Sequence, residues 1–401
     1  MKYDIVIAGG GMIGTSLAVA LAPLDLHIAI IEAVPRGAAQ QPSFDDRSTA
    51  LSRSTQRMYA AMGLWDEIAA AATPVKNIHV SDQGRFGFSH IDAEEQKVEA
   101  LGYVVINRVL GSVLQQALDK VERLDIYCPA TVTAVTRSPD DVQVTLQHDD
   151  GKSEALTSRL LVAADGARSP VRDMLGITAQ HKAYGQTAIV GNLLPEKPLN
   201  HCAYERFTRH GPLALLPISD GRAGFVWTVA ESDAERVLGL DKAAFIAELQ
   251  ETFGFRLGEF SKVGKLEAYP LHLSKAMRLI ATRAVLVGNA AHGLHPVAAQ
   301  GFNLGLRDVA ALCDCIANFD LDDAELLQHY AAWRKSDQGK LVGFTDGLVQ
   351  LFSSNRRSVK AIRSLGMLGF DAVPGVRSLF AKHTMGLAGR LPRLSRGVPL
   401  S

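Results

Sequence analysis

The sequence has little of several features that mark whole classes of protein. Four cysteines in 401 residues are too few and too scattered for a disulfide framework, and they fit a reducing compartment. Basic and acidic residues balance at 42 each, so the net charge gives no indication of a nucleic-acid partner. No run of about 20 apolar residues occurs, so no membrane-spanning helix is expected. Repeats and low-complexity segments are also lacking. What remains is a chain that is 47% hydrophobic and long enough for two domains, or for one large domain with an insertion.

The N-terminal stretch combines apolar strands with a glycine-rich turn. YDIVIA predicts a buried parallel strand, GGGMIG opens a helix, and HIAIIE predicts a second strand that ends at Glu32. Gly9, Gly11 and Gly14 have the G-x-G-x-x-G spacing that brings a backbone turn and a helix N-terminus close to a pyrophosphate. Glu32 is expected to accept hydrogen bonds from ribose hydroxyls, which disfavours the 2′-phosphate of NADP at this site. A plain strand-to-helix turn is the alternative.

A second apolar strand ends in the polar motif LLVAADGARSPVR. Asp165 at the strand end can hold a sugar hydroxyl, or it can cap the helix that follows. Taken alone, the motif favours a cap. Together with the glycine motif, it favours a nucleotide role for Asp165.

A third motif, GNAAHGLHPVAAQGFNLGLRD, passes from a strand through a turn into a helix. Backbone N–H groups near Gln300 to Asn303 would lie at the positive end of that helix and would stabilise negative charge. His292 and His295 have no neighbouring cluster of Cys, Asp or Glu and no visible orienting acid, so no metal site is predicted and a catalytic base is unsupported. We predict a loop that wraps a ligand through its backbone, with His295 before Pro296 lining the cavity and His292 only packing.

The middle of the chain predicts an inserted sheet. Strand-like runs recur between Tyr184 and Ala230, and they suit an antiparallel sheet with one covered face. Helices are expected near Arg108 to Lys120, near Lys242 to Phe253 and over TALSRSTQRMYAAMG. A dinucleotide-type domain is therefore expected to be discontinuous. Its predicted segments are 1–75, 105–180 and 271–340, with 76–104 and 181–270 as the inserted domain and 341–401 as a helical, basic C-terminus.

Together the three motifs resemble the FAD-dependent aromatic hydroxylases, over nearly the whole chain and in the same order. The absence of a second good dinucleotide motif agrees with that family, in which NAD(P)H has no Rossmann domain of its own. FDDRSTALS, HVSDQGRFGF, ERFTRHGPLALLPISDGR and the third motif are similar to the ubiquinone-biosynthesis branch, most of all to the 2-polyprenyl-6-methoxyphenol hydroxylases. The resemblance implies an α/β fold with a Rossmann-like FAD-binding domain, an inserted mixed or antiparallel-sheet substrate domain and a helical C-terminus.

The resemblance also implies which residues hold FAD. They are Gly9, Gly11, Gly14, Glu32, Arg47, Arg108, Asp165, Asn289, Gly301, Phe302 and Asn303. Asn289 replaces an acid that binds the ribityl chain in the wider family, and Ala299 replaces a common glycine. The loop with Pro296, Gln300 and Gly301 is implied to stabilise reduced, anionic flavin. An arginine such as Arg47 or Arg108, taken alone, is more often part of a surface ion pair.

The activity implied by the resemblance is ring hydroxylation of a polyprenyl phenol. NAD(P)H would reduce the flavin, and O₂ would then form a C4a-hydroperoxide whose distal oxygen the electron-rich ring attacks. The substrate is expected near Tyr204, Leu215, Trp227 and His295, although aromatic and aliphatic residues are more often core. No general base is identified. Alternatives are a sister hydroxylase for another ring position, an FAD-dependent prenyl-chain reductase, or a non-catalytic lipid-binding member of a biosynthetic complex.

The C-terminal part of the sequence is basic. From Asn355 to Ser401 it has nine Lys or Arg and one acid, Asp371. A basic tail with apolar interleaving suits an anionic membrane surface or an acidic partner, or else it is only solvated. We expect a cytoplasmic protein in peripheral contact with the inner membrane and with a ubiquinone-biosynthesis complex, and deletion of the tail should lower lipid binding while FAD binding persists. One helical face, which can equally pack on its own domain, carries Phe344, Leu348, Leu351 and Phe352.

Overall fold

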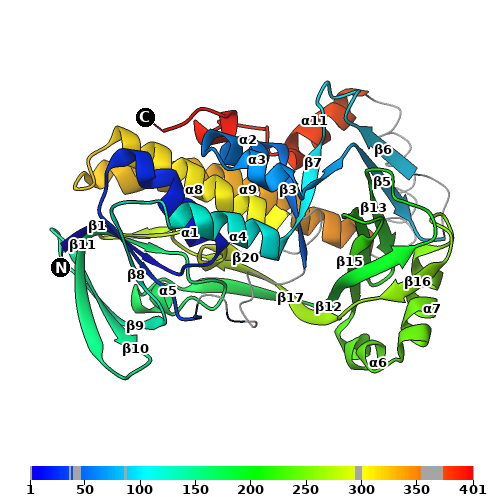
Figure 1. Cartoon of the computed structure of the whole chain (residues 1–401), viewed down its shortest axis with the longest axis horizontal. Coiled ribbons are helices and arrows are strands. Elements are labelled where there is room, and N and C mark those ends of the chain that lie inside the picture. Colours follow the sequence, from blue (N-terminus) through cyan, green and yellow to red (C-terminus); the bar gives the residue numbers. More distant parts are fainter. Residues whose placement is uncertain are drawn as a thin grey trace.

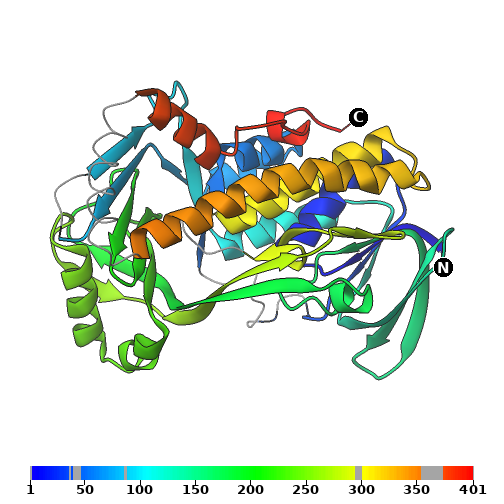
Figure 2. The ribbon, with the colours of Figure 1, turned by 180° about the vertical axis from the view of Figure 1, so that it is seen from behind.

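A computed structural model describes residues 2–35, 38, 47–84, 88–293, 300–353 and 374–400, with the side chains of the long helix α9 described as far as Gly339. The molecule is elongated, with one sheet at each end and two long helices, α8 and α9, beside them (Figures 1 and 2). In the described part, all four cysteines are free thiols.

The N-terminal strand lies inside an eight-stranded sheet. β1 (Lys2–Ala8) pairs in parallel with β2 (Ile28–Ile31) on one side and with β11 (Ser153–Ala163) on the other. The other strands of this sheet are β8 (Leu124–Tyr127), β9 (Ala130–Arg137), β10 (Val142–His148), β18 (Ile280–Ala281) and β19 (Ala284–Leu286). The parallel, doubly buried strands explain the unbroken apolar runs in the sequence.

Helices cover both faces of this sheet. α1 (Met12–Leu21), α4 (Asn107–Leu118) and α8 (Gln300–Asn318) share one core cluster with Ile5 and Ile7 of β1. The alternate residues of β1 face α5 (Pro170–Met174) on the other side. This is the Rossmann-like arrangement that the sequence predicted.

A nine-stranded, mainly antiparallel sheet lies at the other end of the molecule. Its path follows the order β20-β17-β12-β15-β14-β13-β5-β6, and β16 pairs with β12. The strands are β5 (Asn77–Asp82), β6 (Phe88–Asp92), β12 (Ala179–Pro195), β13 (Cys202–Thr208), β14 (Gly211–Pro217), β15 (Ala223–Ala230), β16 (Phe260–Val263), β17 (Glu267–Ala276) and β20 (His292–Gly293). β12 and β17 are long and run back toward the first sheet (Figure 1).

Two short helices cover one face of the nine-stranded sheet. They are α7 (Lys242–Phe253) and α6 (Ala234–Leu238), and their apolar side chains share a core cluster with the sheet. The predicted α/β class with an inserted antiparallel sheet is therefore confirmed. The domain limits proposed at 181 and 271 fall inside β12 and β17, and we keep the division as a proposal.

A small third sheet corrects one helix prediction. β3 (Ser48–Ser52) pairs with β7 (Gly102–Ile106), which also pairs with β4 (Thr73–Val75). The helix expected over TALSRSTQRMYAAMG begins only at α2 (Arg53–Ala61), because Ser52 caps it by accepting a hydrogen bond from the Thr55 N–H at 3.2 Å. The residues before Ser52 form the strand. α3 (Trp65–Ala69) follows α2.

The C-terminal segment packs on the body of the protein. α9 (Ala324–Ser353) runs beside α8, and η5 (Leu394–Arg396) packs on α2 and α8. α11 (Pro374–Thr384) lies near β6, where Ala381 shares a core cluster with Ile91 and Leu101 (Figure 2). Leu394 and Leu400 are buried in the same cluster as β1. This packing is at odds with a tail that can be deleted without harm to FAD binding. The face with Phe344 and Leu348 lies outside the described side chains.

Within the residues that the structure describes, none of the helices has the length and apolar composition needed to cross a bilayer.

Candidate active site

The backbone of the glycine turn between β1 and α1 lies so close to its neighbours that two of its glycines have no room for a side chain. Gly9 has φ +105°, and a Cβ added to it would lie 2.5 Å from the carbonyl oxygen of Ala164. A Cβ on Gly14 would lie 1.9 Å from the oxygen of Gly9. The first turn of α1 has no acidic side chain, and Gly11 at its N-cap supplies no side-chain hydrogen bond. The N–H groups of this first turn therefore remain available for an anion.

Glu32, which directly follows the neighbouring strand β2, is hydrogen-bonded to this turn. Its Oε2 accepts a hydrogen bond from the Gly10 N–H at 2.6 Å, and its Oε1 accepts one from Val34 N–H at 2.8 Å. Each oxygen retains a lone pair, and the side chain is partly exposed. The carboxylate is therefore fixed at the glycine turn, where the sequence predicted a ribose contact.

Asp165 has one satisfied oxygen and one unsatisfied oxygen. Oδ2 accepts a hydrogen bond from the Val171 N–H at 3.0 Å, while Ser169 caps α5 through Arg172 N–H. Oδ1 is buried and has no hydrogen-bond partner among the described residues. Burial raises the pKa of Asp165, although hydrogen bonds to Ser169 and Val171 oppose the rise. Asp165 thus contributes to the cap that the sequence allowed and keeps an acceptor for a ligand.

The third motif lies against the first. A Cβ on Gly288, in η3 (Gly288–Ala290), would lie 3.2 Å from Cγ2 of Ile13, and one on Gly305 would lie 2.9 Å from Cδ1 of Ile13. Since Gly9 contacts Ala164, which precedes Asp165, all three motifs meet around the start of α1. Asn289 is exposed between two buried neighbours, so its amide is accessible to a ligand.

The residues at the start of α8 differ in their surroundings and in their contacts. A Cβ on Gly301 would meet no atom of the described residues within 4 Å. Gln300 is buried and donates to the Thr384 carbonyl at 3.3 Å, and Phe302 packs beside the core. Asn303 joins α8 to β3 and α2, because its Oδ1 accepts from Ser52 N–H and its Nδ2 donates to Ala50 O, both at 2.8 Å. Contact of these residues with FAD stays a prediction. Pro296, His295 and Ala299 lie outside the described residues.

Arg47 and Arg108 come from adjoining segments. The carbonyl of Arg47 accepts a hydrogen bond from Asn107 N–H at 2.8 Å, and Arg108 is exposed in the next position, at the start of α4. The guanidinium of Arg47 lies 4.8 Å from the ring centroid of Tyr269, and its Nε lies 3.9 Å from Glu267 Oε2. Arg47 therefore lies where β3 meets the nine-stranded sheet.

His292 has an acidic partner that the sequence did not reveal. Its Nε2 lies 2.6 Å from Oδ2 of Asp308, and the imidazole is buried with its Nδ1 unpartnered in the described part of the chain. The expectation that no acid orients His292 is wrong, because the turn folds back onto α8 and brings Asp308 beneath it. Since the Gly288 N–H also donates to Asp308 Oδ2, at 3.1 Å, the pair supports the turn itself.

Asp308 belongs to a buried charge network between α8 and α9. Its Oδ1 accepts hydrogen bonds from Arg334 Nε at 2.6 Å and from Gln338 Nε2 at 3.1 Å, and both Arg334 and Arg307 form ion pairs with Asp337. Burial by itself would raise the pKa of Asp308, but the charges of His292 and Arg334 outweigh it and hold the pKa at about 2. The carboxylate is therefore ionised at any working pH. In the described residues no cluster of three or more His, Cys, Asp or Glu could hold a metal ion.

The predicted substrate residues lie on the wrong face of the nine-stranded sheet. Leu215 and Trp227 are 0% and 4% exposed and pack with Phe245 under α7. Tyr204 faces the same side, where its ring meets that of Phe253. The substrate role proposed for Leu215 and Trp227 is therefore corrected to a core role, and Tyr204 lies at the edge of that core.

The opposite face of this sheet carries a row of partly exposed residues that the sequence analysis missed. Backbone register places six residues of this face side by side, one from each of six neighbouring strands. They are Val80, Glu205, Ala214, Val226, Val190 and Glu267. Each of the six is partly exposed, whereas the alternate residues toward α7 are almost all sealed. We call this row the accessible strip. The available signal was alternation: Ala214 stands between leucines in PLALLP, and Glu205 is a lone acid on its strand.

The accessible strip faces the part of the molecule that carries Arg47. Its Glu267 end lies beside Arg47, and a Cβ on Gly224, in the same face, would lie 2.4 Å from Ser48 Oγ. Helix α9 contacts β13 and β14. The strip thus lies on the face of the nine-stranded sheet that is turned toward Arg47 and β3.

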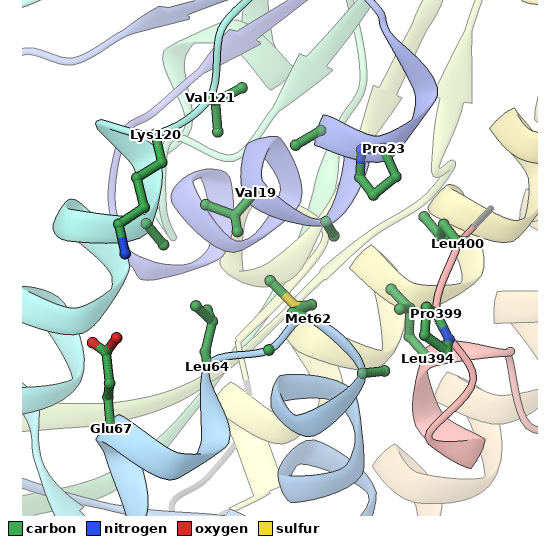
Figure 3. A pocket seen from close by; sticks show the side chains of 15 residues that line it. Val19, Pro23, Met62, Leu64, Glu67, Lys120, Val121, Leu394, Pro399 and Leu400 are labelled. Atoms are coloured by element: carbon green, nitrogen blue, oxygen red, sulfur yellow. The ribbon is translucent and has the colours of Figure 1, made fainter.

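A separate cavity of about 350 Å³ lies among the helices that cover the eight-stranded sheet (Figure 3). Val19, Leu64 and Leu400 are among its lining, with Glu67 and Lys120 as its charged residues. None of the predicted site residues lines it, so it is distinct from the candidate active site.

The residues present fit the adenine-dinucleotide half of FAD. The glycine cradle admits backbone-close approach, the α1 N-terminus is free for a pyrophosphate, and Asp165 keeps a buried acceptor without a partner. Fold and site together define a protein that binds an FAD-type dinucleotide.

The comparisons with known proteins agree. The chain matches the FAD binding domain family over residues 2–345. It is 38% identical over 405 aligned residues to the ubiquinone hydroxylase UbiL of Rhodospirillum rubrum, covering 99% of this chain and 93% of that protein. It is 30% identical to the 3-demethoxyubiquinol 3-hydroxylase of Escherichia coli, covering 96% and 98%.

A solved structure supports the fold. The p-nitrophenol 4-monooxygenase PnpA of Pseudomonas putida matches with a TM-score of 0.81 at 18% identity, over 97% of this chain and 99% of that one. The chain belongs to the FAD binding domain family and, within it, to the FAD-dependent hydroxylases that include these ubiquinone hydroxylases. FAD is its cofactor, with NAD(P)H and O₂ as the co-substrates typical of the class.

Proposed function

We propose that this protein hydroxylates the aromatic ring of a polyprenylated phenol in ubiquinone biosynthesis. The observation that carries the proposal is the 38% identity to a ubiquinone hydroxylase over nearly the whole length of both chains. The fold supports it, since the accessible strip lies next to Arg47 and β3, close to the elements that fit FAD.

The ring position is proposed as the step from 2-polyprenyl-6-methoxyphenol to the 1,4-benzoquinol. This rests on the motifs that the chain has in common with that branch of hydroxylases. Hydroxylation at carbon 3 is the second candidate, because the Escherichia coli relative is a 3-demethoxyubiquinol 3-hydroxylase.

The chain's own residues would bind and orient rather than react. The α1 N-terminus and the glycine turn would hold the pyrophosphate, Glu32 the ribose, and Asp165 a further cofactor hydroxyl. Backbone N–H groups near Gly301 would stabilise negative charge on the cofactor. Bound FAD supplies the electron transfer and the oxygen activation.

The test combines genetics with chemistry. A strain that lacks this gene should accumulate one prenylated phenol, and mass spectrometry with NMR of that intermediate identifies the ring carbon that stays unmodified. The purified holoenzyme should consume O₂ and NAD(P)H and add one oxygen to that intermediate. Substrate-stimulated NAD(P)H oxidation that yields only peroxide or a reduced prenyl chain would refute the proposal.

The location is proposed to be cytoplasmic, with peripheral contact at the inner membrane and with a ubiquinone-biosynthesis complex. A prenylated substrate that dissolves in the bilayer supports membrane contact. Flotation with anionic vesicles and co-purification of the full-length protein test these two contacts. Protein that stays at the bottom of the gradient and elutes alone would exclude them.

A further inference from the structure

Glu205 is the one acid at its end of the accessible strip. β13 presents it directly opposite Ala214 of β14, and β5 places Val80 on its other side. From Ala214 the row continues through Val226 and Val190. An aromatic ring lying on this row would therefore rest on small apolar side chains, with a carboxylate at its edge.

Glu205 is partly exposed and has no polar partner among the described residues, since it forms no hydrogen bond or ion pair with them. Desolvation by burial is the sole cause of its raised pKa, which reaches about 7. Buried carboxylates are otherwise paired, so a lone one indicates a missing partner.

No other charged group compensates Glu205. On its own strand, Tyr204 and Arg206 point to the opposite face, where burial is the main cause of the shifted pKa of each. On β5, Asp82 lies on the same face as Val80, and its charge acts on Arg206. β14 carries no charged residue, and among the α9 side chains described as far as Gly339 none interacts with Glu205. Among the described residues Glu205 therefore keeps its acceptor oxygens open to a ligand.

We propose that Glu205 accepts a hydrogen bond from the phenolic hydroxyl of the substrate and takes its proton as the ring is hydroxylated. The inference rests on the proposed function, since it names the residue that receives a phenol in the same site. It also assigns the prenylated ring to the accessible strip, in place of the residues under α7.

The balance of the phenolic proton closes on these two groups. The phenolic O–H bond breaks, the proton passes to a carboxylate oxygen of Glu205, and the electron pair stays on the phenolic oxygen, which makes the ring more nucleophilic. At the hydroxylated carbon the C–H bond breaks as the ring becomes aromatic again, and its proton goes to the second oxygen atom of O₂, which leaves as water. The proton on Glu205 returns to the phenolic oxygen in the product, so Glu205 ends in its starting state. A base whose pKa lies near the working pH suits this task, and such bases typically accelerate reactions about 10²–10⁴-fold.

A reporter phenol tests the contact without turnover. 2-Prenyl-4-nitrophenol is titrated with pH in the oxidised holoenzyme, and the visible absorbance of its phenolate form gives the pKa of the bound ligand. In the wild type the neighbouring carboxylate disfavours a second negative charge, so the ligand pKa should be raised. In Glu205→Gln the ligand pKa should fall by about one unit or more, as expected when a like charge is removed. Equal ligand pKa values in both proteins, or no binding by the wild type, would overturn the inference.

Turnover gives a second, separate readout. Glu205→Gln should retain FAD and the wild-type melting temperature or a higher one, yet form product about 10²–10⁴-fold more slowly. Its rate should rise with pH through the range in which a free phenol ionises, near pH 10, whereas the wild-type rate should level off above about pH 7. Glu205→Asp should restore part of the rate.

The matched control is Glu251→Gln, an exposed glutamate on α7 of the same domain, which should behave as wild type. A Glu205→Gln enzyme with the wild-type rate and pH profile would refute the role of Glu205 while leaving ring hydroxylation intact. If instead the wild type shifts the reporter pKa but forms no hydroxylated product, the proposed function fails while the phenol contact stands.

Discussion

Asp308 and Glu205 both lie in the interior of this protein, but their surroundings are opposite. Asp308 is 0% exposed and accepts hydrogen bonds from Gly288, His292, Arg334 and Gln338, so its pKa is held at about 2. Glu205 is partly exposed, has no partner in the described chain, and has a pKa raised to about 7. A carboxylate satisfied by its own protein maintains structure. One that the fold leaves unsatisfied is available to a ligand.

The largest expected effect is on stability, and it comes from replacing Asp308, the carboxylate whose hydrogen bonds are satisfied. Asp308→Asn removes the fully buried counter-ion of Arg334 and leaves it paired with Asp337 alone, and removal of one member of a buried ion pair typically costs about 3–5 kcal/mol. Urea denaturation should show this loss in the free energy of unfolding. Asp149→Asn, in an exposed turn, is the control and should change it by less than about 0.5 kcal/mol. An equally mild effect of Asp308→Asn would mean that the network contributes little.

Removal of the unsatisfied carboxylate should act in the opposite direction. The folded-state pKa of Glu205 lies above the unfolded value of 4.5, so wild-type stability declines as pH rises from about 4.5 to 7. Glu205→Gln removes this term and should be more stable than the wild type at pH 8, by about 1–3 kcal/mol since the group is partly exposed. At pH 4 the two proteins should unfold alike. A destabilised variant at pH 8 would show that Glu205 has a structural partner.

Lowering the pH should distinguish Asp308 from Glu205 further, because their contributions to stability change in opposite directions. The folded-state pKa of Asp308 lies below its unfolded value, so its contribution is complete above about pH 4 and is lost as pH falls toward 2. The difference in unfolding free energy between wild type and Asp308→Asn should therefore shrink by about 2 kcal/mol over that interval. Guanidinium titrations at pH 4, 3 and 2 measure it. A constant difference would place the pKa of Asp308 near its ordinary value.

Asp165 stands between the two cases, with one oxygen bonded and one buried without a partner among the described residues. Asp165→Asn keeps an acceptor for the Val171 N–H and should change stability of the cofactor-free protein by only about 0.5 kcal/mol. It should weaken FAD binding by about 1.5–3 kcal/mol, roughly tenfold to a hundredfold, if the free oxygen accepts from the cofactor. Flavin fluorescence measures the Kd. An unchanged Kd would assign Asp165 to the helix cap alone.

The parts of the site that could be predicted from sequence are local in the chain. Gly9, Gly11 and Gly14 lie within one turn, and Glu32 ends the next strand, so spacing alone places them together. Asp165 was ambiguous in sequence and is ambiguous in structure, because it serves a cap with one oxygen and leaves the other open.

The rest depends on register and on long-range folding. Tyr204 and Glu205 are adjacent, and a strand sends adjacent side chains to opposite faces, so choosing the more conspicuous aromatic residues selected the core face. His292 and Asp308 meet because η3 folds back onto α8. The alternation of residues along a strand does not show which of its two faces a helix will cover.

The packing of the chain's last described residues has a consequence for its synthesis. Leu400 and Leu394 share a core cluster with Ile5 and Leu17, and Leu400 also lines the cavity beside α1 (Figure 3). A ribosome therefore produces the cofactor-binding strands early, but it cannot complete the core behind them until nearly four hundred residues have emerged.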